Sequence, residues 1–283
     1  RGKESFSQDR RKTASLRDRE GNAFLSDEIR LQLSGLFPRF EKRVIIRAVL
    51  DDSSLSGEMS GFLGELEGLT DRISCIREHL DPDERERRQA AGQLLPAFRL
   101  EREDGSGGNI LFHGVPGGHE FNSFVVALYN MSGPGHPVDE GLKQRVASID
   151  KDINVKVMVS LSCTMCPEVV MAVQRAASLS PRVTGEMIDL MHYPELKKKY
   201  KIMNVPCMVI NDTQVYFGNI REKPLPEPAV PRKPDNHTIE IKDVSFSKYL
   251  GSLRKILRQF TENPRTVHRK LMVLMTFLRF VSA

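Results

Sequence analysis

Two cysteines separated by two residues are the strongest candidates for chemistry in this sequence. Cys163 and Cys166 follow a run typical of a buried strand, residues 155–161, and a helical pattern begins at Pro167. A cysteine just before a helix faces unpaired N–H groups and the positive end of the helix dipole, which favour the thiolate. We therefore predict that Cys163 is the attacking thiol and that Cys166, one turn inside the helix, is the resolving thiol.

A proline later in the chain supplies a second feature of such a site. Pro206 follows Val205 and directly precedes a late strand pattern. We predict a cis peptide bond here and a loop that packs against the dithiol. Val205 and Pro206, together with Thr164 and Met165 between the cysteines, then form the predicted substrate-docking surface.

Two structural roles compete with redox chemistry for this dithiol. One is half of a zinc site, but zinc needs four ligands, and no second C-x-x-C or H-x₃₋₅-H occurs; Cys75, Cys207 and His192 lack suitable spacing. We therefore predict no metal site. The other is a static disulfide. Cys75 and Cys207 lie in strand patterns and are predicted to be small buried residues rather than redox partners.

The order of predicted elements occurs twice along the chain. The first half has a helix at 26–37, then strands and helices at 44–50, 57–69, 73–77, 97–103, 110–113 and 120–131, with residues 81–93 predicted as a loop or frayed helix. The second half has strands and helices at 155–161, 167–179, 183–189, 194–201, 208–211 and 214–217. Leu50 can be laid over Leu161 and Pro96 over Pro206, which indicates a duplicated α/β unit. Residues 51–55 then stand where the other copy has 162–166, so only one copy has the dithiol.

The composition and the ends of the chain suggest five segments. The 283 residues are 40% hydrophobic and 28% charged, which is typical of about two globular domains. The predicted segments are a disordered leader (1–22), a first copy (23–135), a second copy (136–220), a proline-rich linker (221–236) and a basic helical tail (237–283). A helix after the last hairpin is missing from the pattern, so either residues 247–260 fold back over the sheet or that face is exposed.

Charge and cysteine content limit the function classes. The net charge is +5, but residues 253–283 alone contain seven basic residues and one acidic residue, so the basicity belongs to the tail. No basic–aromatic module indicates nucleic-acid binding. No run reaches the roughly 18 apolar residues of a membrane span, and the first residues do not form a secretory signal. With four cysteines in the chain, we predict a cytoplasmic protein and no membrane partner.

Residues from about 22 to 218 resemble the N-terminal domain of the flavoprotein subunit of alkyl hydroperoxide reductase, the peroxiredoxin reductase. The matching motifs lie at 49–53, 112–114 with 117–121, 160–163 with 166–170, and 204–206. The resemblance implies two fused thioredoxin-like folds in one continuous sheet, the first without the dithiol. It also implies that the dithiol receives electrons from a flavin-linked dithiol and reduces a peroxiredoxin disulfide.

The resemblance assigns a further catalytic role to Glu120, as an acid near the dithiol that tunes it. A nearby carboxylate disfavours a second anion and can accept the proton of the resolving thiol. The alternative role for Glu120 is helix capping. For His119 the same two interpretations, a role near the dithiol or helix capping, remain open.

The cofactors of that family are expected outside this chain. No G-x-G-x-x-G follows a strand here, so FAD and NAD(P)H are expected on an upstream reductase, fused or separate. A homodimer through the full-length protein is a further expectation. Two alternatives to the peroxiredoxin relay are a general protein disulfide oxidoreductase and a non-catalytic interaction module.

Overall fold

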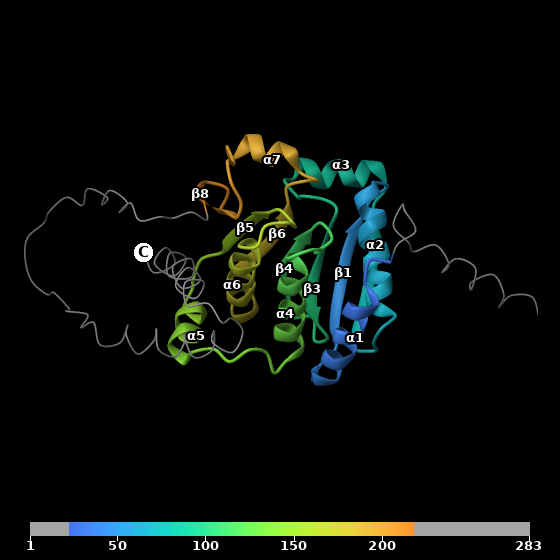
Figure 1. The fold of residues 1–283 in the computed structure, drawn as a ribbon. Helices are drawn as coiled ribbons and strands as arrows, with labels where there is room; N and C mark the ends of the chain where they lie inside the picture. The colour runs from blue at the N-terminus through green and yellow to red at the C-terminus, as the bar shows by residue number, and fades with distance from the viewer. Residues whose placement is uncertain (1–22, 218–283) are drawn as a thin grey trace, which may run out of the picture.

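The computed structural model describes residues 23–217, which form a single layered α/β structure around one sheet (Figure 1). The predicted leader, linker and tail, including the helix expected at 247–260, lie outside the described residues. The sheet has eight strands in the order β2-β1-β3-β4-β6-β5-β7-β8.

The first copy contains four strands and the helices around them. Its elements are α1 (Asp27–Leu36), η2 (Phe37–Arg39), β1 (Val44–Leu50), α2 (Ser54–Glu67), β2 (Ile73–His79), α3 (Pro82–Ala90), β3 (Ala97–Arg102), β4 (Gly107–His113) and α4 (Glu120–Ser132). The second copy repeats the order from its first strand to its last hairpin. Its elements are α5 (Glu140–Ala147), β5 (Ile153–Val159), α6 (Cys166–Leu179), β6 (Val183–Asp189), α7 (Pro194–Lys199), β7 (Cys207–Ile210) and β8 (Gln214–Phe217).

The two copies join edge to edge into one sheet. Within each copy the first two strands are parallel and the later pairs are antiparallel. Between the copies β4 pairs in parallel with β6, from Ile110 opposite Gly185 to His113 opposite Ile188. The predicted pair of fused thioredoxin-like folds with a continuous sheet is therefore confirmed.

The helices α2, α4 and α6 pack together against one face of the sheet. The ring of Phe124 on α4 lies 5.4 Å from the ring of Phe62 on α2 and 5.4 Å from that of Phe112 on β4. The α4 helix also packs on α6 of the second copy. Alternate residues of β1 point into this core, which is why its β-branched sequence forms a half-buried strand. The short helices α3 and α7 lie at the same end of the sheet (Figure 1, top).

Some local predictions differ from the structure. Residues predicted as a loop or frayed helix form α3, which is capped by Asp81 through a 2.9 Å bond from the N–H of Glu84. None of the residues of α3 is buried, so it leaves no apolar periodicity in the sequence. The helix α5 was not predicted, and β5 ends at Val159 rather than Leu161.

Candidate active site

The dithiol lies where β5 passes into α6. Cys163 and Cys166 form a disulfide with their Cα atoms 5.5 Å apart. Cys166 is the first residue of α6 and is fully buried, whereas Cys163 is only partly buried in the preceding loop. A disulfide partner can therefore reach Cys163 but not Cys166.

The start of α6 provides the electrostatic environment of Cys163. The N–H of Cys166, the first of α6, donates to Cys163 Sγ over 3.2 Å, so this sulfur accepts one of the N–H groups that have no partner within the helix. After reduction, the same N–H and the helix dipole would favour a thiolate at Cys163.

The proline loop packs against this sulfur. The Val205–Pro206 peptide bond is cis, as the sequence predicts, and the Val205 carbonyl oxygen lies 3.9 Å from Cys163 Sγ. Pro206 is buried and Val205 is half-buried. Thr164 is exposed and Met165 is partly exposed between the cysteines. The structure thus brings all four predicted docking residues to the same region as the dithiol.

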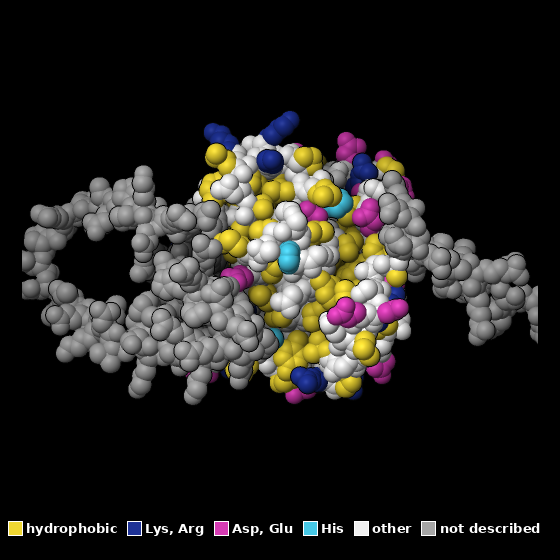
Figure 2. Space-filling view, viewed as in Figure 1, with side chains coloured by type: hydrophobic (Ala, Val, Ile, Leu, Met, Phe, Trp, Pro, Cys, Tyr) yellow, Lys and Arg dark blue, Asp and Glu magenta, His cyan; other side chains and the backbone are white. Residues whose placement is uncertain are grey.

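The segment between β6 and the cis-proline presents apolar and basic side chains to solvent. Met191 and Met203, on the loops that follow β6 and precede the cis-proline, are 80% and 85% exposed. The adjacent helix α7 ends in three exposed lysines, Lys197, Lys198 and Lys199. Basic side chains project over α7 at the top of the molecule (Figure 2). Exposed thioethers adapt readily to a protein partner, so this surface suits docking.

Glu120 is the first residue of α4 and is fully buried. Its Oε2 accepts a hydrogen bond of 2.5 Å from Ser123 Oγ, while its Oε1 has no hydrogen-bond partner among the described residues. Burial, together with the charge of Asp189, raises the pKa of Glu120 to about 7, although the Ser123 bond opposes the shift. A carboxyl with this pKa can exchange a proton near neutral pH. Its neighbour His119 is exposed and offers no side-chain cap to α4.

A glycine-containing loop of the first copy brings Glu120 to the second copy. The N–H of His119 donates to the carbonyl of Leu161 over 3.0 Å, two residues before Cys163. Gly118 lies in the same contact with φ +53°, and a Cβ there would come within 2.6 Å of the Leu161 oxygen. The close approach therefore requires glycine. The copy without the dithiol thus places an acid beside the loop that bears the dithiol.

Asp189 is a residue at this site that the sequence did not indicate. It ends β6, is buried, and accepts the N–H of Met191 at Oδ1 over 3.0 Å. Its Oδ2 lies 3.8 Å from His192 Nε2 and has no hydrogen-bond partner in the described range. The pairing of β6 with β4 places this carboxylate near Glu120, and its pairing with β5 places it opposite Val159, at the end of the strand that leads to Cys163. The one feature of the sequence that could have pointed to Asp189 is an acidic residue at the end of a predicted buried strand.

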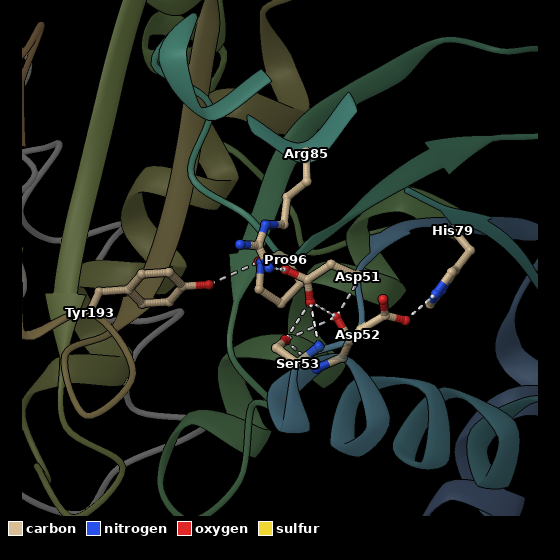
Figure 3. A network of polar contacts seen from close by, with 8 residues as sticks. Asp51, Asp52, Ser53, His79, Arg85, Pro96 and Tyr193 are labelled. Carbon is tan, nitrogen blue, oxygen red and sulfur yellow. Dashed lines mark hydrogen bonds and ion pairs between the residues drawn. The ribbon is translucent and has the colours of Figure 1, made fainter. Parts of the chain in front are cut away.

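The first copy has a carboxylate in place of the dithiol (Figure 3). Asp51 lies three residues before the first residue of α2, just as Cys163 does before α6, so the overlay shifts by one residue from the predicted one. Asp51 Oδ1 accepts the N–H of Ser53 over 3.0 Å and the hydroxyl of Ser56 over 2.7 Å. Burial alone would raise the pKa of Asp51, but these bonds and the Arg85 charge outweigh it and lower that pKa.

The remaining cysteines are unsuited to this chemistry. Cys207 is fully buried, and burial raises the pKa of its thiol to about 11. Burial and the charge of Glu67 raise the pKa of the half-buried Cys75 to about 12. Between residues 23 and 217, no group of three or more His, Cys, Asp or Glu side chains could hold a metal ion. Within the same range, no helix is long and apolar enough to cross a membrane.

The tandem fold and its dithiol define a thiol–disulfide oxidoreductase of the thioredoxin type. Residues 153–225 match the family model described as a thioredoxin domain. The alkyl hydroperoxide reductase protein AhpF of Xanthomonas campestris pv. phaseoli is 33% identical over 187 residues, which are 66% of this chain and 33% of that protein. The N-terminal domain of AhpF from Enterococcus faecalis is 36% identical with a TM-score of 0.63, covering 69% of this chain and 94% of that chain. The chain therefore belongs to the AhpF family of alkyl hydroperoxide reductase proteins, as a counterpart of their N-terminal domain.

The similarity covers only part of the length of these relatives. The chain spans about a third of the length of the curated relatives it matches. A protein disulfide oxidoreductase from Aeropyrum pernix has a TM-score of 0.55 at 18% identity, covering 66% of this chain and 84% of that chain, and this similarity shows a shared fold alone.

Proposed function

We propose that this chain relays electrons from a flavin-dependent reductase to the disulfide of a peroxiredoxin. The observation that carries the proposal is the dithiol, in which a reachable Cys163 accepts the first N–H of α6 and a buried Cys166 begins that helix. Such an arrangement separates the thiol that meets the partner from the thiol that releases it. FAD and NAD(P)H would belong to the reductase, either fused to this chain or separate.

The proposed reaction moves two electrons in two displacement steps. The Cys163 thiolate attacks one sulfur of the partner disulfide; a mixed disulfide forms, and the partner's other sulfur leaves as a thiolate. Cys166 then gives its proton to the Glu120 carboxylate and attacks Cys163 Sγ. The 163–166 disulfide forms and the partner's second sulfur leaves, so the partner is reduced and this chain is oxidised. The flavin-linked dithiol reduces this chain by the same steps in reverse.

Glu120 is proposed as the acid–base group of this reaction. Support comes from its burial, its unbonded Oε1 and its pKa of about 7. Glu120 and Cys166 also begin two helices that pack against each other, α4 and α6. Val205, Pro206, Thr164 and Met165 are proposed to contact the partner beside Cys163.

A reconstituted assay tests the relay. The purified chain is mixed with NADH, a flavin-containing reductase module of the family, an oxidised two-cysteine peroxiredoxin and peroxide, and NADH oxidation is followed. We expect turnover that depends on this chain and saturates with peroxiredoxin. Insulin disulfides reduced as fast as peroxiredoxin would favour the general disulfide oxidoreductase. No exchange with either substrate would favour the non-catalytic module. The cytoplasmic location and the homodimer stay predictions.

A further inference from the structure

A buried tyrosine of the second copy bonds to the proline loop of the first. Tyr193, in the segment between β6 and α7, donates its hydroxyl to the carbonyl of Pro96 over 2.9 Å (Figure 3). Burial and the carboxylates of Asp51, Glu195 and Asp189 raise the pKa of Tyr193, so the hydroxyl remains a donor. This bond links two residues that are 97 positions apart in the sequence.

Pro96 holds the same place in the first copy as Pro206 in the second. Each follows a cis peptide bond and directly precedes a strand, β3 or β7. In the second copy this loop lies against Cys163. In the first copy its carbonyl instead accepts a hydrogen bond from within the chain. Each copy therefore supplies a residue to the other: the first supplies Glu120 to the dithiol region, and the second supplies Tyr193 to the proline loop of the copy that lacks the dithiol.

The segment anchored by Tyr193 lies against the dithiol loop. The N–H of Leu190 donates to the carbonyl of Val159 over 3.1 Å, where β5 ends and the connection to Cys163 begins. Met191, the next residue, presents an 80% exposed side chain there. The ring of Tyr193 also packs edge-on against His113 of β4, with ring centres 6.1 Å apart. One end of the segment is thus fixed to β5 and the other to the first copy.

We propose that Tyr193 is a positioning residue for the dithiol site, which holds residues 190–193 so that Met191 meets the partner protein beside Cys163. The inference rests on the proposed function and assigns a task to the copy that lacks the dithiol. A segment fixed before the encounter loses less conformational freedom when the partner binds. Loss of the anchor therefore weakens docking of a protein disulfide and leaves the chemistry at Cys163 unchanged.

Two matched variants test the inference. Tyr193→Phe removes one oxygen atom and the bond to Pro96, whereas Tyr200→Phe removes a hydroxyl bonded to Asp212 within the second copy. In the reconstituted assay we expect Tyr193→Phe to raise KM for the peroxiredoxin about fivefold, the scale of one neutral hydrogen bond. Its kcat, and its rate with the small neutral disulfide bis(2-hydroxyethyl) disulfide, should stay at the wild-type values. Tyr200→Phe should leave KM unchanged.

Three results would overturn the inference: an unchanged KM in Tyr193→Phe, an equal rise of KM in both variants, or a parallel loss with the small disulfide. Amide hydrogen exchange of the oxidised protein provides a readout that needs no partner. The bonded N–H groups of Leu190, Met191 and His192 should exchange faster in Tyr193→Phe than in Tyr200→Phe, and equal rates would refute the anchor. Absence of peroxiredoxin turnover in the wild type would refute the proposed function instead, and hydrogen exchange would still decide the role of Tyr193.

Discussion

The N–H of Cys166 donates to the sulfur of Cys163 over 3.2 Å, so the two thiols of one redox pair have different surroundings. Cys163 lies in a partly exposed loop at the start of α6, and Cys166 is enclosed by the core. This difference predicts which sulfur forms the bond to a partner and which sulfur breaks it.

Substitution of each cysteine should therefore give a different result. Cys163→Ser should abolish turnover with the flavin reductase and peroxiredoxin, because no reachable thiolate remains. Cys166→Ser should stop after the first step and accumulate a mixed disulfide with the peroxiredoxin. Non-reducing electrophoresis with mass spectrometry detects that adduct, and Cys207→Ser serves as the control. Full activity of Cys163→Ser would refute the assignment.

Replacement of Glu120 by glutamine should change the pH profile of the reaction. An ionised carboxylate is needed to accept the proton of Cys166, so the wild-type single-turnover rate should rise with pH through about 7. Glu120→Gln should be about tenfold slower at pH 7.5 and should lack that inflection. Stopped-flow mixing of reduced protein with oxidised peroxiredoxin measures both features. Glu195→Gln, an exposed acid on α7, should retain the wild-type profile; an identical profile in Glu120→Gln would leave no acid–base role for Glu120.

The same substitution should stabilise the oxidised protein above neutral pH. The pKa of Glu120 is raised from 4.5 to about 7 on folding, so the folded state binds more protons between these values. The unfolding free energy should therefore fall as pH rises through this window, by up to about 3 kcal/mol. Glu120→Gln carries no charge to bury, so it should gain stability over the wild type at pH 8 and show no gain at pH 4. Urea unfolding at both pH values measures the difference, and a variant that is less stable at pH 8 contradicts the raised pKa.

The sequence predicted those features that depend on local patterns. The strands carry β-branched apolar runs and C-x-x-C precedes Pro167, so the duplicated order and the dithiol could be found without a structure. The region of α3 was predicted only as a loop or a frayed helix, because none of the residues of α3 is buried. Asp189 lies near Glu120 because β6 pairs with β4 of the other copy, a relationship that no local pattern contains. The position of Glu120 was predicted from family resemblance, and its environment depends on a contact with Leu161 of the other copy.

Asp51, the carboxylate that the first copy has in place of the dithiol, should contribute to stability, and its removal should leave small-disulfide exchange unchanged. The pKa of Asp51 is lowered from 3.8 in the folded protein, so its stabilising effect should be present above pH 3.8 and lost as pH falls below that value. Asp51→Asn should reduce the unfolding free energy at pH 7 by about 1 to 3 kcal/mol, because buried donors lose their charged acceptor. Urea unfolding measures the loss, and the rate with bis(2-hydroxyethyl) disulfide should match the wild type. Asp52→Asn, at an exposed side chain paired with His79, should cost less than Asp51→Asn; equal losses would contradict the special role of Asp51.

Gly118 should be intolerant of the smallest side chain. Its φ of +53° disfavours alanine, and the added Cβ would lie 2.6 Å from the carbonyl oxygen of Leu161, which is backbone and cannot rotate away. Gly118→Ala should lower the unfolding free energy by about 2 to 3 kcal/mol and slow peroxiredoxin reduction, because the shift moves the loop before Cys163. Gly57→Ala is the matched control, since a Cβ there meets nothing within 4 Å and lies inside α2. That variant should gain about 0.5 to 1 kcal/mol, so a Gly118→Ala protein as stable and active as Gly57→Ala would show that the first copy does not hold the dithiol loop in place.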